Sequence, residues 1–339
     1  MKNSIFKSVI VMLMLSSCMK EDEAITLPLP GNVKQMSAVM GNNYETQIFV
    51  NLETGATVSR PYKAYDLAFE ASAQGMRIYL NSGKYMFACN SNSTVITNSD
   101  STGKEWNIDD EQLLDDSLSM KYYWQTPSFN SDGSNVYIID RGKPEHTGSA
   151  RWRKFKVLSV SSAEYKICYS KYDNSAYDTA VIAKDPNYAL MYFNFDTPHQ
   201  LVQQAPPSSD WDVVFTKYTH VFFEEPVGSP FRYYPVCGSL SNIWKGTQGL
   251  RQQKDSVVNY IPMDQCNYNA IANANFSKAA DIVGYNWKYY DFNDAHYHVY
   301  SDLYFVVKSS LGYYYKVKMV DFYSQQGDKG TVTFESQRM

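Results

Sequence analysis

One short sequence pattern occurs twice in the chain, and this repeat constrains the fold more than any other feature. The first copy, YDLAFEASAQGMRIYLN, runs from Tyr65 to Asn81, and the second, WDVVFTKYTHVFFEE, runs from Trp211 to Glu225, about 145 residues later. Each copy starts with an aromatic residue, an aspartate, two apolar residues and a phenylalanine. In the second copy Trp211, Val213 and Phe215 alternate with other residues, which predicts a strand with these three side chains on its core face. We expect the aspartate to accept backbone N–H groups and so to have a structural role.

Further segments extend the repeat in the same order on both sides of the two copies. The segment IFVNLETG precedes the first copy and MYFNFDT precedes the second. Downstream, VYIIDRG, KFKVLSV and EYKICYS in the first half match YFVVKSSLG, YKVKMVDF and GTVTFESQ in the second half. Matched segments in one order predict a tandem duplication with its junction near Lys184–Asn187. The alternative is chance repetition of aromatic-Asp-apolar strings in an all-β protein.

Strand-forming residues dominate the rest of the chain. Aromatic residues make up 15% of the sequence, with 29 tyrosines, and runs of β-branched and aromatic residues are separated by Gly, Asn, Asp and Ser. The pattern predicts an all-β fold of antiparallel, β-rich domains. Two segments are candidates for helices: residues 109–120, which fit a short helix or an acidic loop, and residues 268–284.

The N-terminus has the features of a processing segment. Lys2 and Lys7 precede a short apolar stretch that ends in LSSC at Cys18, a pattern that resembles a bacterial lipobox. We therefore expect residues 1–18 to be a lipoprotein signal peptide, Cys18 to be lipidated and residues 19–38 to be a linker. The alternative is an ordinary secretory signal. The sequence KEDE after Met19 resembles the signal that sends Bacteroidetes lipoproteins to the cell surface, although acidic residues there also suit a plain tether.

Charge and cysteine spacing argue against several classes of partner. The formal net charge is −4, and removal of the two signal lysines makes it −6, with no basic stripe that would predict nucleic-acid binding. The remaining cysteines are widely spaced and form no CxxC pair, which argues against a zinc site: Cys89, Cys168, Cys237 and Cys266. One or two disulfides and buried free thiols both remain open.

No pattern in the sequence predicts an enzyme. The chain contains no nucleophile elbow, no phosphate-binding glycine loop and no HExxH motif. The adjacent carboxylates Glu224–Glu225 and Asp109–Asp110 would point apart on a strand, whereas glycoside cleavage needs carboxylates that face each other.

The repeated segments resemble the HmuY-like family, the surface haem-binding lipoproteins or haemophores of Bacteroidetes. The resemblance rests on YETQIFVNLETG with YDLAFEASAQGMRIYLNSG, NVYIIDRG with KFKVLSVSSAEYKICY, SDWDVVFTKYTHVFF, and LYFVVKSSLGYYYKVKMVDFYSQQGDKGTVTFESQ. Read this way, residues 39–183 and 184–339 are two tandem HmuY-like units. Family members with a single unit are shorter than this chain, so the duplication is a departure that leaves open whether one, both or neither unit binds haem.

The resemblance implies a function in haem and iron acquisition. It implies a lipid-anchored protein at the outer-membrane surface that binds haem non-covalently and passes it to a TonB-dependent outer-membrane receptor, with a homodimer as one option. Iron ligation in this family is by side chains, a histidine pair in the best-known pattern and methionine in some relatives. The alternative is a carbohydrate-binding or structural surface lipoprotein that does not bind haem.

The segment DAHYHVY carries the most suggestive donors. His296 and His298 are two residues apart and would face the same side of a strand, and the segment lies in the region where the family has a ligand-bearing loop. Asp294 could orient an imidazole as a hydrogen-bonding partner. The alternative is a solvated loop with incidental histidines. A His-x-His pair can also begin a metal site, but the sequence shows no third ligand, so no metal other than haem iron is predicted.

The second axial donor is less well defined by sequence. Met263, in YIPMDQC, lies in the region of the family's other ligand, and methionine is an adequate iron donor, although a lone methionine more often fills a core. His220 is a further candidate, expected on the outer face of its strand. His146 and His199 are expected in surface turns.

Overall fold

Antiparallel sheets account for the regular structure of the protein. The structure is a computed structural model, which describes residues 30–114, 117–120, 134–143, 145–196 and 201–339. Within these ranges the only helical elements are short 3-10 turns, and no helix is long and apolar enough to cross a membrane. The 3-10 turns are η1 (Tyr62–Ala64), η2 (Ser82–Lys84), η3 (Ile96–Asn98), η7 (Gly148–Arg151) and η8 (Ile243–Lys245).

The first two sheets form a β-sandwich that we call the first sandwich. Sheet I has the order β11 (Asp178–Ala183), β10 (Glu164–Lys171), β9 (Trp152–Val160), β8 (Tyr137–Asp140), β6 (Phe87–Asn90) and β7 (Trp106–Asn107). Sheet II has the order β13 (Leu201–Val202), β12 (Leu190–Phe193), β4 (Leu67–Glu70) and β5 (Ile78–Leu80).

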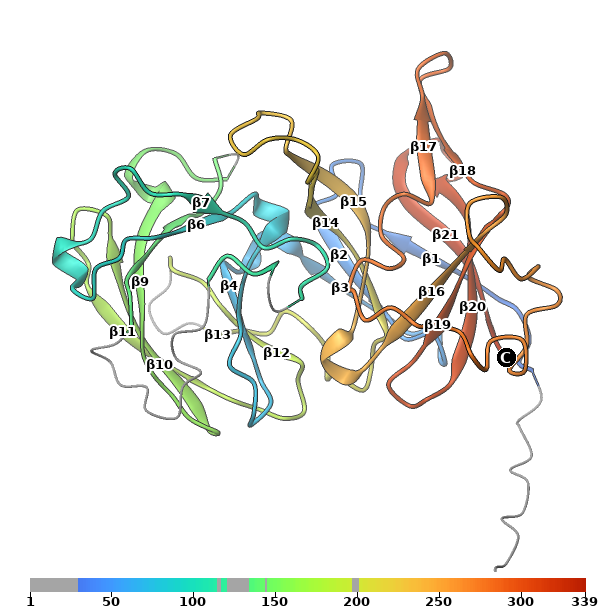
Figure 1. The fold of residues 1–339 in the computed structure, drawn as a ribbon, viewed down its shortest axis with the longest axis horizontal. Helices are drawn as coiled ribbons and strands as arrows, with labels where there is room; N and C mark the ends of the chain where they lie inside the picture. Colours follow the sequence, from blue (N-terminus) through green and yellow to red (C-terminus); the bar gives the residue numbers. More distant parts are fainter. Residues whose placement is uncertain (1–29, 115–116, 121–133, 144, 197–200) are drawn as a thin grey trace, which may run out of the picture.

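The other two sheets form the second sandwich. Sheet III has the order β15 (Tyr233–Ser241), β14 (Val213–Val221), β2 (Thr46–Val50) and β3 (Thr57–Pro61). Sheet IV has the order β1 (Lys34–Val39), β21 (Lys329–Arg338), β20 (Tyr314–Tyr323), β19 (Leu303–Lys308) and β16 (Gln248–Gln253). A separate hairpin, β17 (Lys288–Asp291) and β18 (His296–Val299), projects beyond sheet IV (Figure 1).

The sheets stack as four layers in the order I, II, III and IV, with an apolar layer in each gap (Figure 1). Because side chains alternate between the two faces of a strand, each central strand contributes residues to two of these apolar layers. In β4, Leu67 and Phe69 enter the core between sheets I and II, whereas Ala68 enters the core between sheets II and III. In β2, Phe49 lies in that same middle layer while its neighbours face sheet IV. The two central sheets are therefore apolar on both faces, as expected for fully covered strands.

The chain closes the second sandwich with its first strands. Strand β1 pairs with β21, and β2 pairs with β14, so residues 34–61 belong to the C-terminal sandwich. Strand β12, beyond the predicted junction, pairs with β4 of the first sandwich. The predicted boundary between residues 39–183 and 184–339 therefore does not coincide with the boundary between the two sandwiches.

Strand order nevertheless corresponds between the two sandwiches. Sheet I corresponds to sheet IV when the order β11-β10-β9-β8-β6 is aligned with β1-β21-β20-β19-β16. Sheet II corresponds to sheet III when the order β13-β12-β4-β5 is aligned with β3-β2-β14-β15. Both η2 and η8 end at a residue with left-handed backbone, Tyr85 at φ 60° and Gly246 at φ 81°. The two sandwiches therefore share one strand order and one turn geometry.

Two local expectations differ from the structure, and one open alternative is settled by it. Residues 268–284 form turns instead of a helix, because the Asn267 side chain accepts the backbone N–H groups of Asn269 and Ala270 and closes a local turn. The described part of residues 109–120 takes the loop alternative. Trp211 lies before β14 begins, so it does not follow the alternation and packs in the middle layer, away from Val213 and Phe215.

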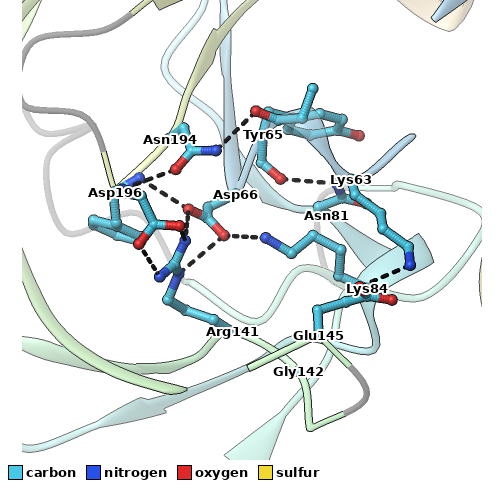
Figure 2. Close-up of polar contacts among 12 residues, drawn as sticks. Lys63, Tyr65, Asp66, Asn81, Lys84, Arg141, Gly142, Glu145, Asn194 and Asp196 are labelled. Atoms are coloured by element: carbon cyan, nitrogen blue, oxygen red, sulfur yellow. Dashed lines mark hydrogen bonds and ion pairs between the residues drawn. The ribbon is translucent and has the colours of Figure 1, made fainter. Parts of the chain in front are cut away.

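The aspartate of the first repeat copy lies in a buried ionic network (Figure 2). Asp66 is completely buried and accepts Nη2 of Arg141 at 2.9 Å, Nζ of Lys84 and the backbone N–H of Phe195 at 2.9 Å. Arg141 also donates to Asp196 through Nη1 at 2.6 Å. Every partner in this network is satisfied by another described residue, which identifies it as a structural connection within the first sandwich.

The four described cysteines are all buried free thiols, which settles the alternative that the sequence left open. Cys237 illustrates the reason, because its Sγ lies 3.5 Å from the sulfur of Met40 in the core between sheets III and IV. Burial also raises the pKa of the Cys237 thiol to about 11, so this residue is not a reactive thiolate at neutral pH.

Candidate functional site: a histidine-bearing hairpin

The predicted donors His296 and His298 lie on strand β18. Register pairs His296 with Asp291 and His298 with Tyr289 of β17, so these four side chains share one face of the hairpin. The opposite face carries Tyr297 and Val299, which pack against the core between sheets III and IV. The shared face predicted for the two histidines from their spacing is therefore present.

Short polar contacts fix the connection between the two strands. Asp291 Oδ1 accepts the backbone N–H of Asn293 at 2.8 Å, and Asp294 Oδ1 accepts that of His296 at 3.0 Å. Ala295, between them, has a left-handed backbone with φ 57°. These turns return the chain so that Asp294 lies beside the strand that carries both histidines.

Each histidine ring has a defined neighbour. The Nε2 atom of His298 lies 2.7 Å from Oδ2 of Asp294, and this hydrogen bond lowers the pKa of the Asp294 carboxyl. The ring of His296 lies over Tyr323 of β20, with centroids 4.7 Å apart. A carboxylate that holds one imidazole nitrogen leaves the other, Nδ1 of His298, to a ligand.

Exposed aromatic side chains surround the histidines. Tyr289 contacts His298 at a centroid distance of 5.5 Å and Tyr300 at 5.0 Å. Phe292, in the turn, is 89% exposed and packs on the edge of Tyr290. The hairpin therefore presents imidazole and aromatic groups together on an open surface, an arrangement suited to a flat, partly apolar ligand.

The base of the hairpin is anchored in the core. The buried ammonium of Lys288 donates to the carbonyl of Cys237 at 2.7 Å and lies 4.2 Å from the ring of Trp287 and 4.5 Å from that of Phe322. Burial lowers the pKa of Lys288 to about 8. The backbone N–H of Tyr297 donates to the hydroxyl of Tyr323 at 2.8 Å. The projecting strands thus have a rigid support.

The structure adds one carboxylate, Asp291, that the sequence did not associate with the histidines. One ligand atom each from Asp291, Asp294 and His298 lie within 4.8 Å of one another, close enough to hold a metal ion. Sequence reasoning missed Asp291 because its proximity arises from cross-strand register. The same applies to Tyr289, although both residues belong to the aromatic segment YNWKYYDF, which contains strand β17.

Met263 and His220 do not join the hairpin histidines. Met263 packs with Tyr304 and Val306 on the outer face of sheet IV, whereas the hairpin packs against the inner face of that sheet. His220 lies on β14, with its Nδ1 bound to Glu111 and its ring 4.9 Å from Tyr285. Glu111 is buried and also accepts the backbone N–H of Val221 at 3.2 Å, so this contact fits a structural role for His220.

The remaining predicted residues lie elsewhere. His146 is in the first sandwich, where it lines a hollow of about 370 Å³ with Trp152 and Tyr172. His199 and the predicted lipidation site Cys18 lie outside the described residues.

A sequence profile described as HmuY protein matches residues 187–335, a range that includes the hairpin. This matched segment, slightly under half of the chain, is similar to the HmuY family. Two solved structures are similar over most of the chain. Apo PinO from Porphyromonas gingivitis is 10% identical, with a TM-score of 0.28, and the alignment covers 91% of this chain and 97% of that chain. The apo HmuY analog (TFO) from Tannerella forsythia is 12% identical, with a TM-score of 0.26, and covers 92% and 99%. No curated protein matches this chain. The match of residues 187–335 to the HmuY profile favours a binding function related to haem over an enzymatic one.

Proposed function

We propose that this protein is a surface lipoprotein that binds haem at the β17–β18 hairpin and releases it intact to a TonB-dependent outer-membrane receptor. The observation that carries the proposal is the HmuY match over residues 187–335, which spans a hairpin with two histidines on one face. Lipidation at Cys18 would keep the protein at the membrane surface.

The donor set of the hairpin fits a haem iron from one side. His298 is the favoured ligand, because Asp294 already holds its ring through the other nitrogen. His296 is the second candidate on the same face, next to Tyr323. Tyr289 and Tyr300 would line the macrocycle. Bound haem would supply the iron to which these imidazoles bind, and the protein would alter none of its bonds.

Ligation from one side suits transfer. Met263 lies on the outer face of sheet IV and His220 is bound to Glu111, so neither side chain joins the hairpin face that carries His296 and His298. One face of the bound ring would then remain open to a receptor or to a second copy of the chain. Fewer protein ligands mean a faster release, which is the property that a carrier needs.

Absorption spectroscopy tests this proposal. The protein without residues 1–18 is titrated with haemin, and we expect a saturable shift of the Soret band. The double substitution His296→Ala with His298→Ala should abolish the shift, because it removes both imidazoles from the hairpin face. His146→Ala, a histidine change in the other sandwich, is the matched control and should leave the titration unchanged.

Three results would argue against the proposal. These are the absence of any shift, a shift that survives the double substitution, and a shift that His146→Ala alone removes. Asp291, Asp294 and His298 could instead hold a metal ion, which would compete with haem for His298. Adding Zn²⁺ before haemin tests for this competition.

A further inference from the structure

A cleft of about 530 Å³ lies where the two sandwiches meet, away from the hairpin. Sheet II contributes one wall with Glu70, Arg77 and Tyr79, and the segment after sheet III contributes the other with Trp244, Lys245 and Thr247. Both halves of the molecule are needed to form it. A concave site of this size, with aromatic and polar side chains from two domains, has the usual features of a small-molecule site.

Aromatic side chains and a buried carboxylate order the floor of the cleft. The indole Nε1 of Trp244 donates to the hydroxyl of Tyr79 at 3.1 Å, and that hydroxyl donates to Oε1 of Glu70 at 3.1 Å. The two rings meet edge to face, with centroids 5.6 Å apart. Glu70 also binds Nη1 of Arg77 at 2.7 Å. This chain of contacts holds the Trp244 ring in place at the cleft wall.

Buried polar groups without a partner line the cleft and an adjoining cavity. Thr247, in the cleft, is 1% exposed, and its hydroxyl has no hydrogen-bond partner among the described residues. Tyr79 and Trp244 also line a cavity of about 70 Å³ together with Trp211 and Tyr218, whose Nε1 and hydroxyl are buried without a described partner. Trp211 and Tyr218 are 2% and 1% exposed. Buried polar groups without a partner are rare in native proteins, and either an ordered water or a ligand with hydroxyl groups would satisfy them.

Charge at the cleft is mostly positive. Among the described residues, Arg77, Lys245 and Lys278 line it, against the one carboxylate of Glu70, which Arg77 already binds. Lys245 Nζ donates only to the carbonyl of Pro186, at 3.3 Å, in the described part of the chain. The two lysines thus give the mouth of the cleft an excess of positive charge, which favours an anionic ligand.

We propose that this cleft binds an acidic saccharide, a sugar whose ring carries a carboxylate. The apolar face of the sugar would stack on Trp244, its hydroxyl groups would bond to Thr247 and to the donors of the inner cavity, and its carboxylate would lie between Lys245 and Lys278. This site shares no residue with the haem site, so either can exist without the other.

The experiment compares methyl β-glucuronide with methyl β-glucoside, which differ in the carboxylate, on the protein without residues 1–18. Tryptophan fluorescence is the readout, because Trp244 lines the cleft. We expect saturable glucuronide binding and weaker glucoside binding.

Lys278→Glu should weaken glucuronide binding about two- to fivefold, the range of an exposed charge pair, and leave the glucoside unaffected. Thr247→Val keeps the side-chain shape and should weaken both sugars about two- to tenfold, the range of one hydrogen bond.

Lys143→Glu, an exposed lysine in the first sandwich, is the matched control and should change neither titration. Thermal unfolding of each variant shows that the fold is intact. Failure of glucuronide to bind, equal affinity for both sugars, or binding that is insensitive to both Lys278→Glu and Thr247→Val overturns the proposal. Haemin titration of the same samples is unaffected by any of these results, so the two proposals fail separately.

Discussion

Asp66 and Asp212 occupy equivalent positions in the two sandwiches but have opposite electrostatic surroundings. Each precedes the strand of its repeat copy, β4 or β14, and is buried. Asp66 Oδ2 accepts the backbone N–H of Phe195 at 2.9 Å, and Asp212 Oδ2 accepts that of Leu52 at 2.8 Å. The backbone frame around the aspartate is therefore the same in both halves.

The cations differ. In the first sandwich Lys84 ends η2 and reaches Asp66 in the interior, whereas Lys245, at the equivalent end of η8, is exposed at the cleft. Arg141 follows β8, and Ser309 follows the corresponding strand β19. The Ser309 hydroxyl is buried and has no hydrogen-bond partner among the described residues. The second sandwich thus keeps the carboxylate without a cation at either corresponding position.

This difference reverses the direction of the pKa shift. Burial by itself would raise the pKa of Asp66, but Lys84 and Arg141 outweigh it and hold this pKa below its usual range. Asp212 lacks such partners, so burial raises its pKa to about 6, only partly opposed by the Leu52 N–H. The comparison shows that the fold requires the backbone contacts of the aspartate, while the ion pairs are a local property of one sandwich.

The largest effect is expected from removing the charge at the two positions. Asp66→Asn leaves Lys84 buried without a carboxylate, and we expect a loss of about 3–5 kcal/mol in the free energy of unfolding. Asp212→Asn keeps an acceptor for Leu52 and removes an unpaired buried charge, so stability at pH 7 should be unchanged or higher. Urea denaturation at pH 7 measures both.

A second substitution separates charge from shape at Asp66. Adding Lys84→Met to Asp66→Asn removes the orphaned cation and should recover part of the lost stability. Asp210→Asn, an exposed aspartate near the second repeat copy, is the control and should have no effect. Equal losses for Asp66→Asn and Asp212→Asn would contradict the electrostatic difference between the sandwiches.

The next largest effect is expected in the pH dependence of the free energy of unfolding. A carboxyl whose pKa is raised by folding stabilises the protein fully below its unfolded value and loses that contribution as the pH rises through the folded value. For Asp212 the window lies between 3.8 and about 6, and the shift of roughly two units corresponds to about 3 kcal/mol. Unfolding free energies at pH 4 and pH 7 should therefore differ less in Asp212→Asn than in the parent protein. Asp66, with a lowered pKa, should instead lose its contribution only as the pH falls below about 3.8. A pH profile that is identical with and without Asp212 would show that its charge has no cost.

Local patterns predicted the strands well, but not their partners. Alternation in KFKVLSV and YKVKMVDF identified β9 and β20 because the period of a strand is read from adjacent residues. The alternation fails at the end of YKVKMVDF, where the structure shows a β-bulge that turns Phe322 inward and leaves Asp321 exposed. The closure of the second sandwich by β1–β3 depends on contacts between chain ends, which no local pattern contains.

The candidate site likewise has features that the sequence predicted and features that it did not. The shared face of His296 and His298 follows from their spacing on one strand and was predictable. The separation of Met263 and His220 from that face depends on which side of a sheet each residue takes and on how the sheets stack. The cleft between the sandwiches requires Tyr79 and Trp244, which are distant in sequence and meet only across the middle layer.

The smallest expected effect concerns what the two sandwiches share. The side-chain amide of Asn81 donates to the carbonyls of Tyr62 and Tyr65 at 2.7 and 2.9 Å, and that of Asn242 donates to the carbonyls of Ser208 and Trp211, both at 3.0 Å. Because the contacts match and neither involves the ion network, Asn81→Ala and Asn242→Ala should each cost about 1–2 kcal/mol, the range for leaving buried acceptors unpaired. Urea denaturation of the two variants at pH 7 measures the costs side by side. Similar values would confirm that the asparagine frame is common to both halves, whereas a loss confined to Asn81→Ala would mean that the first sandwich alone depends on it and that its equivalence to the second is limited to strand order.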